Sequence, residues 1–315
     1  MLLKNLIKKI PRDKEKITIS GLTTCSNEVK KNYIFFAIKG HKFNGEKFID
    51  DAIKKGASVI ICSKNCKFKN KNILIIKTKN IRYCLSEISS KFYRLKPKNI
   101  IAVTGTNGKT SVADLFYQIL KINHVPVASI GTLGIKYNNK IIKTNLTSPD
   151  TITLHKTLNF LKNKKINNVI IESSSHGLEQ NRLHHIDFKG AIFTNFSQDH
   201  LDYHKTMRSY LNAKLILFRK ILKKNSSIIS DIEIDQFISL KKIAKKRSLK
   251  IFDINNVIKK IRLTNLTLYS DFKIKNLAMA FRAVKLCGMK DSLIYESIKK
   301  IKDVSGRLEL IRKFH

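Results

Sequence analysis

A glycine-containing loop after an apolar run carries the residue types that hold phosphate groups. Residues 100–111 read Ile-Ile-Ala-Val-Thr-Gly-Thr-Asn-Gly-Lys-Thr-Ser. Gly105 and Gly108 let backbone N–H groups turn toward phosphate oxygens, and the start of a following helix favours negative charge there. Lys109 can reach the β- and γ-phosphates, while the Thr110 hydroxyl can ligate Mg²⁺. Although the standard Walker A loop has glycine where this chain has valine, at position 103, the pattern predicts phosphate binding rather than a glycine turn with a surface lysine.

Three stretches resemble the motifs of one enzyme family. Residues 104–111 are similar to the ATP loop of the Mur ligases and folylpolyglutamate synthetases. Residues 171–182, Ile-Glu-Ser-Ser-Ser-His-Gly-Leu-Glu-Gln-Asn-Arg, resemble the hallmark E-V-S-S-H-G-L-x-Q-x-R of MurE-type ligases. Residues 193–204, Phe-Thr-Asn-Phe-Ser-Gln-Asp-His-Leu-Asp-Tyr-His, resemble their F-T-N-L-x-x-D-H-L-D-Y-H. By this resemblance the chain is identified as a member of the Mur ligase family, of the MurE type, from about residue 19 onward.

The resemblance implies an ATP-dependent ligase of peptidoglycan precursor synthesis. Such an enzyme adds the third amino acid to UDP-MurNAc-L-Ala-D-Glu, and we expect meso-diaminopimelate in preference to lysine. The γ-phosphoryl group of ATP passes to the D-Glu side-chain carboxylate, an amine attacks the acyl phosphate, and an amide remains. The expected cofactors are ATP and Mg²⁺.

The resemblance also implies catalytic and metal-binding residues. Lys109 would neutralise charge on the transferring phosphoryl group. Glu172, at the end of a predicted strand, would hold Mg²⁺ together with Thr110, since carboxylate and hydroxyl oxygens are ligands that Mg²⁺ accepts. His200 matches the family's histidine ligand to a metal ion. Lys214 matches the lysine that Mur ligases carry as a carbamate, and a carbamylated lysine is therefore expected here.

Substrate contacts carry over from the same resemblance. The residues expected to bind ATP are Gly105, Thr106, Asn107, Gly108, Lys109, Thr110, Ser111, Asn276 and Arg307. The residues expected to contact the acceptor are Thr147, Ser148, Ser174, Gln180 and Arg182. The residues expected to hold the UDP group are Ser26, His41, Lys42 and Phe43. In the UDP region the family's usual D-S-R reads Cys25-Ser-Asn27, so a carboxylate and a guanidinium are both missing.

Strands that alternate with helices surround these motifs and predict an α/β fold. We expect an N-terminal α/β UDP-binding domain at 1–97, then a mostly parallel-sheet P-loop-type ATP-binding domain at 98–304, and at 305–315 a hinge to an absent C-terminal domain. The predicted strands are 34–38, 57–62, 73–76, 99–103, 169–171, 191–194, 227–229 and 250–254. The predicted helices are 46–55, 82–94, 111–122, 210–220, 274–286 and 292–301.

Composition limits the other classes of function. Hydrophobic residues make up 43% of the 315 residues, which is typical of packed globular proteins. No run of 18 uncharged apolar residues predicts a membrane span, and no signal peptide is apparent, so a cytoplasmic protein is expected. The formal net charge of +39 comes from lysines scattered along the chain without interleaved aromatic residues, so nucleic acid is not an expected partner. The five cysteines lack zinc-type spacing and indicate reduced thiols.

Two alternatives remain open from the sequence. Because the third domain of the family is not represented, the chain could be a non-catalytic remnant that binds ATP or a nucleotide sugar, or a separate C-terminal domain could be its partner. Another Mur-type ligase, such as a folylpolyglutamate synthetase or the MurF type, is the alternative within enzymes. The motifs at 175–178 and 200–204 favour the MurE type over both.

Overall fold

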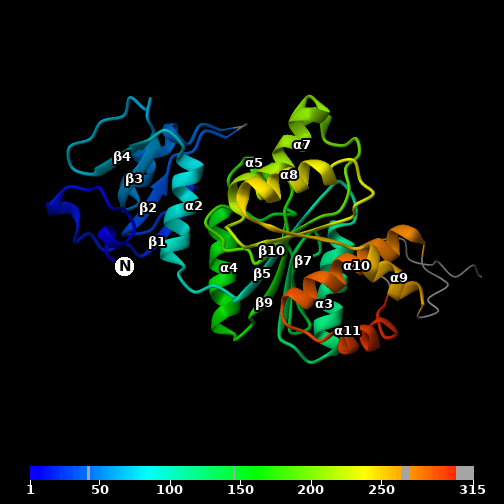
Figure 1. Ribbon diagram of the computed structural model, residues 1–315. Helices are drawn as coiled ribbons and strands as arrows, with labels where there is room; N and C mark the ends of the chain where they lie inside the picture. Colours follow the sequence, from blue (N-terminus) through cyan, green and yellow to red (C-terminus); the bar gives the residue numbers. More distant parts are fainter. Residues whose placement is uncertain (41–42, 145, 264–269, 303–315) are drawn as a thin grey trace, which may run out of the picture. The chain divides into compact units, whose positions relative to one another are not determined.

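The computed structural model describes residues 1–40, 43–144, 146–263 and 270–302 and divides into two compact units (Figure 1). Unit 1 comprises residues 1–94, 150–159 and 180–185, and unit 2 comprises residues 95–149, 160–179 and those from 186 onward. Each unit has its own sheet. Among the described residues, no helix is long and apolar enough to cross a membrane.

Unit 1 is built on a four-stranded parallel sheet with the strand order β1-β2-β3-β4. Its strands are β1 (Gly21–Thr23), β2 (Tyr33–Phe36), β3 (Ala57–Ser63) and β4 (Leu74–Thr78), and its helices include α1 (Ile49–Lys54) and α2 (Ile81–Phe92). Because successive residues of a strand point to opposite faces, Ile34 and Phe36 pack into a core with Leu85 of α2. Phe35 packs into a second core with Ile49 of α1.

Unit 2 holds an eight-stranded sheet with the order β12-β11-β10-β5-β9-β6-β7-β8. The first six strands of this order are parallel neighbours, and β6, β7 and β8 are antiparallel. The strands are β5 (Asn99–Thr104), β6 (Val127–Gly131), β7 (Gly134–Tyr137), β8 (Lys140–Ile142), β9 (Asn168–Glu172), β10 (Gly190–Phe193), β11 (Ser227–Ser230) and β12 (Lys250–Asp253).

Helices α3 (Lys109–Ile122), α9 (Asn255–Arg262), α10 (Asp271–Leu286) and α11 (Asp291–Ile298) pack on one face of this sheet (Figure 1). Val103 of β5, Phe116 of α3 and Phe281 of α10 belong to one buried cluster. The remaining helices are α4 (Thr151–Asn163), α5 (Ser175–Glu179), α6 (Leu201–His204), α7 (Met207–Ile216), which continues into a π turn at Leu217–Ile221, and α8 (Phe237–Arg247).

This architecture confirms the expected α/β class, and each predicted strand and helix overlaps an observed one. The antiparallel extension β6-β7-β8 was not predicted. Its turn, Asn138-Asn139, has positive φ at both residues (43° and 63°), which is the two-residue hairpin geometry that asparagine tolerates. The Asn-Asn pair between two short apolar runs was therefore a usable hairpin signal.

Candidate active site

The phosphate loop connects β5 to α3 at the carboxyl edge of the unit 2 sheet, where ligands bind in open parallel sheets. Gly105 has φ +148° and Gly108 has φ +83°, a region that residues with a side chain rarely adopt. A Cβ at Gly105 would overlap Thr194 Oγ1, and one at Gly108 would come 2.6 Å from Asn276 Oδ1. Both glycines are therefore required, and Asn276 of α10 lies against the loop, as a residue beside a bound nucleotide would.

Two lysines converge on the backbone of this loop. The Nζ atoms of Lys109 and Lys214 both donate to Gly105 O, at 2.9 and 2.7 Å, and Lys109 Nζ also donates to Thr106 O at 2.6 Å. Lys214 is 1% exposed, and its Nζ lies 4.2 Å from the centroid of the Tyr210 ring. Burial, together with the charge of Lys109, lowers the pKa of Lys214 to about 7, although Asp199 opposes the shift.

Glu172 ends β9 and is 1% exposed. Its carboxylate accepts hydrogen bonds from Thr110 Oγ1 (2.9 Å), from the Thr132 backbone N–H (2.9 Å) and from Thr132 Oγ1 (3.1 Å). Burial raises its pKa, and the hydrogen bonds from Thr132 and Thr110 and the charge of Lys109 oppose this rise. A Cβ at Gly131 would overlap Glu172 Oε1, so glycine at the end of β6 makes room for the carboxylate.

A cavity of about 260 Å³ in unit 2 brings most of the predicted nucleotide residues together. It is lined by Thr106, Asn107, Gly108, Lys109, Thr110, Ser111, Thr132, Thr147, Ser174, Ser175, Asp199, His200 and Lys214. Thr132, Ser175 and Asp199 were not predicted from the sequence. Within the part of the chain that the structure describes, no group of three or more His, Cys, Asp or Glu residues is arranged to hold a metal ion.

His200 lines this cavity and has φ +51°, just before α6. Its Nε2 is 3.5 Å from Asp199 Oδ2, and its ring centroid is 5.2 Å from that of His176. In the same segment, His204 Nε2 and Ser175 Oγ are within hydrogen-bond distance, at 2.9 Å. Burial lowers the pKa of His204, although Glu179 opposes the shift. His204 therefore ties α6 to α5 as a largely neutral imidazole.

The predicted acceptor residues have different environments. Thr147 lines the cavity, and its hydroxyl is 3.2 Å from that of Thr132. Ser148 is 1% exposed, donates to Glu172 O at 2.8 Å and accepts from the Ser174 N–H at 2.9 Å. Ser148 does not line the cavity and instead holds the turn that follows β9, while Ser174 reaches the cavity itself.

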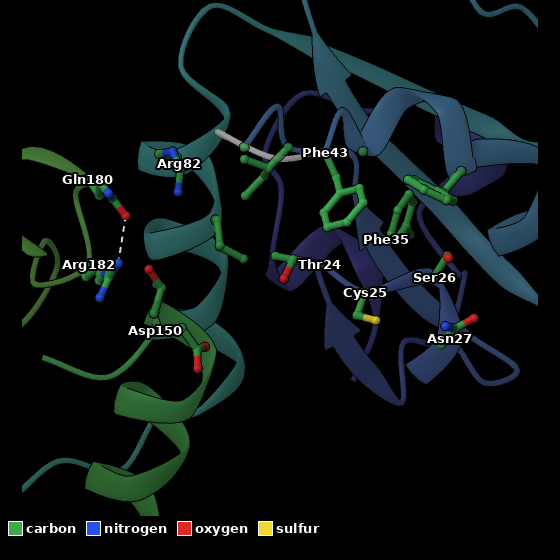
Figure 2. Close-up of a pocket in the computed structure, with 16 residues that line it drawn as sticks. Thr24, Cys25, Ser26, Asn27, Phe35, Phe43, Arg82, Asp150, Gln180 and Arg182 are labelled. Carbon is green, nitrogen blue, oxygen red and sulfur yellow. Dashed lines mark hydrogen bonds between the residues drawn. The ribbon is translucent and has the colours of Figure 1, made fainter. Parts of the chain in front are cut away.

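A second cavity, of about 530 Å³, lies within unit 1 (Figure 2). Four of the residues predicted to bind UDP or the acceptor line it: Ser26, Phe43, Gln180 and Arg182. Gln180 Oε1 accepts from Arg182 Nη2 at 2.7 Å. The predicted residues His41, Lys42 and Arg307 lie outside the described residues. The sequence did not single out Thr24, Arg82 or Asp150, which also line this cavity.

A hydrogen-bonded network stands beside Ser26, where the chain departs from the family's D-S-R pattern. Asn27 Oδ1 accepts from Lys55 Nζ at 2.9 Å, and Lys55 Nζ pairs with Asp51 Oδ2 at 3.0 Å. The Lys55 and Ser26 hydrogen bonds lower the pKa of Asp51. A carboxylate and a cation are thus present here, supplied by α1 and the residue that follows it.

Comparison with known proteins places this architecture in one family. The Mur ligase middle domain matches residues 103–289, and the Mur ligase family catalytic domain matches residues 18–93. The chain is 38% identical to a UDP-N-acetylmuramoyl-L-alanyl-D-glutamate–2,6-diaminopimelate ligase of Rickettsia montanensis, over 93% of this chain and 66% of that protein. It is 35% identical to the ligase of that name from Wigglesworthia glossinidia brevipalpis, over 98% of this chain and 69% of that protein.

The fold comparison agrees. A solved structure of a UDP-N-acetylmuramoyl-L-alanyl-D-glutamate–2,6-diaminopimelate ligase superimposes with a TM-score of 0.84 at 23% identity, and the match covers 100% of this chain and 69% of that one. The chain thus spans about two thirds of the length of the relatives that it matches. On the two domain matches and these identities, the chain belongs to the Mur ligase family.

Proposed function

We propose that this chain carries the ATP-binding and acceptor-binding parts of a MurE-type ligase, which joins meso-diaminopimelate to UDP-MurNAc-L-Ala-D-Glu in the cytoplasm. The observation that carries the proposal is the set of groups around one loop. Lys109 and Lys214 share Gly105 O, and Glu172 accepts from Thr110 at the start of α3. In this proposal residues 1–97 hold the UDP group and residues 98–304 hold ATP. The part of the relatives that this chain does not match would be needed to complete turnover.

The side chains around Glu172 fit a hard divalent cation. A threonine hydroxyl and a carboxylate 2.9 Å apart offer two oxygen ligands, which is the kind of donor that Mg²⁺ prefers. When bound, Mg²⁺ supplies neutralisation of the charge on the transferring phosphoryl group. The chain's own contribution is placement, because the Thr132 hydrogen bonds hold the carboxylate and the loop N–H groups orient the phosphates.

We also propose that Lys214 is carbamylated. Carbamate formation requires a neutral amine, and a pKa of about 7 leaves a large neutral fraction at physiological pH. The product is an anion, which removes the repulsion between two ammonium groups at Gly105 O. A carboxylate-like group at this position would face the cavity beside His200.

Phosphate release from ATP tests the proposal. With ATP and Mg²⁺, we expect release to rise when UDP-MurNAc-L-Ala-D-Glu is added and to rise further with meso-diaminopimelate. Lys109→Ala should abolish acceptor-stimulated release, whereas Lys121→Ala, on an exposed position of the same helix, should leave it unchanged. Nucleotide binding without any acceptor-stimulated release would instead support the non-catalytic alternative.

A second experiment adds a separate polypeptide. It consists of the part of the Rickettsia montanensis ligase that lies outside the match with this chain. If that polypeptide completes the enzyme, its addition should increase the phosphate release that depends on meso-diaminopimelate. Equal stimulation by lysine would contradict the preference for meso-diaminopimelate.

A further inference from the structure

Arg82, which the sequence motifs did not identify, places a charged group in the unit 1 cavity. It lies in the first turn of α2, which is capped by Asn80, whose Oδ1 accepts from the Tyr83 N–H at 3.0 Å. Its side chain lines the cavity of about 530 Å³. With the described residues Arg82 makes no hydrogen bond and no ion pair within 4.0 Å. A guanidinium stays charged at every physiological pH, so its natural partner in a cavity is an anion.

The neighbours of Arg82 define which part of a ligand would reach it. Figure 2 shows Arg82, Gln180 and Arg182 at one end of the cavity, and Ser26 and Asn27 at the other. The hydrogen bond from Arg182 to Gln180, at 2.7 Å, orients the second guanidinium of this end. If the UDP group lies at Ser26, the end that carries the two arginines faces the remainder of the substrate.

The cavity also contains a carboxylate, and its position bears on the charge balance. Asp150 precedes α4, and its Oδ1 accepts from the Thr153 N–H at 3.0 Å. That bond holds the carboxylate at the helix start, and among the described residues Asp150 forms no ion pair with Arg82. The charged side chains that line the described part of the cavity are therefore two arginines and one aspartate.

We propose that Arg82 binds the α-carboxylate of the D-Glu residue in the acceptor and so selects for an acidic peptide end. This inference rests on the proposed function. D-Glu has two carboxylates, and in that reaction only the side-chain carboxylate is phosphorylated. The α-carboxylate stays ionised throughout and needs a fixed cation. A guanidinium fits it because two parallel N–H groups match two carboxylate oxygens.

Isothermal titration calorimetry on the full chain can isolate this contact. The ligands are UDP-MurNAc-L-Ala-D-Glu, its D-isoglutamine analogue, in which the α-carboxylate is an amide, and UDP alone. For Arg82→Met, affinity for the acid should fall roughly 10- to 100-fold, as expected for loss of a hydrogen-bonded charge partner. Affinities for the amide and for UDP should stay within about twofold of the wild type, because neither carries the D-Glu α-carboxylate. Arg82→Lys should be intermediate.

Arg94→Met is the matched control, since Arg94 follows the same helix, is exposed and does not line the cavity. Retained UDP binding shows that each variant is folded at this cavity. An equal loss for acid, amide and UDP would assign Arg82 to the diphosphate and overturn the inference, as would unchanged acid affinity. If the wild type binds ATP but not UDP-MurNAc-L-Ala-D-Glu, the proposed function fails, and the inference fails with it.

Discussion

Two ammonium groups, those of Lys109 and Lys214, donate to a single backbone oxygen, Gly105 O. Burial leaves the Lys214 ammonium with almost no solvent to stabilise its charge, and the charge of Lys109 destabilises it further. The pKa of Lys214 therefore falls to about 7 from its ordinary value of 10.5. At neutral pH such a lysine therefore exists both as the ammonium and as the reactive neutral amine.

We predict that Lys214 carries a carbamate whose amount rises between pH 6 and pH 8. Below the pKa the amine is protonated and cannot react with CO₂, and above it the neutral form dominates. With ¹³C-bicarbonate, NMR should show one carbamate signal in the wild type. The signal should be absent in Lys214→Met and present in Lys220→Met, an exposed lysine further along the chain. A signal that survives in Lys214→Met would assign the carbamate elsewhere.

Gly131 is a second residue with a specific role, which follows from its lack of a Cβ atom. A Cβ at this position would displace the Glu172 carboxylate from Thr132 and Thr110. Gly131→Ala should cost about 1–3 kcal/mol of stability, as overpacking does, and should weaken Mg²⁺-dependent ATP binding. Gly288→Ala, which meets open space at φ +99°, should cost about 1 kcal/mol and leave ATP affinity unchanged. Equal ATP affinity in the wild type and Gly131→Ala would mean that Glu172 has no part in the nucleotide site.

At the scale of elements, α10 and α3 together shape the phosphate loop. Asn276 of α10 packs against Gly108, and the residue before it, Lys275, pairs with Asp231 and Glu233 at 2.7 Å each. These carboxylates follow β11, so the pair of contacts fixes the start of α10 to the edge of the sheet. Although partial burial opposes it, the hydrogen bonds that Lys275 donates to Asp231 and Glu233 raise its pKa.

Lys275→Met should therefore loosen the start of α10 and weaken ATP binding. Removing one partner of a buried pair costs about 3–5 kcal/mol. Asp231 is 1% exposed but Lys275 is 34% exposed, so we expect a smaller loss, about 1–2 kcal/mol. Chemical denaturation and ATP titration measure the two effects. Lys285→Met, on the same helix and in a surface pair with Asp291, should change the free energy of unfolding by less than about 1 kcal/mol. Indistinguishable behaviour of the two variants would contradict the anchoring role.

At the scale of the whole molecule, the two cavities belong to different units, one to each sheet. We predict that Lys109→Ala abolishes ATP binding and leaves the affinity for UDP within about twofold, since Lys109 does not line the unit 1 cavity and additivity holds for separate sites. Calorimetric titration of each ligand into wild type and variant provides the measurement. A large loss for both ligands would show that the sites are energetically coupled.

Much of this organisation could be read from local patterns. Apolar runs at β3, β5 and β10 are nearly continuous because parallel strands are buried on both faces, so the runs themselves located these strands. The phosphate loop was equally recognisable in the sequence, since Gly105 and Gly108 occupy backbone conformations that few other residues adopt. The pairing of β6 with β7 and of β7 with β8 went unpredicted because a weak, exposed edge strand such as β8 has little hydrophobic pattern.

The sequence by itself determined the α/β class, the positions of most elements and the family motifs, because these depend on residues that are close neighbours in the chain. Only the tertiary structure decided that Lys214 meets Gly105, 109 residues away, and that Thr132 holds Glu172. It also decided that Ser148 turns into the protein and that Arg82 lines a cavity. Burial, shared hydrogen bonds and shifted pKa values arise from such distant contacts, and chain-local patterns do not encode them.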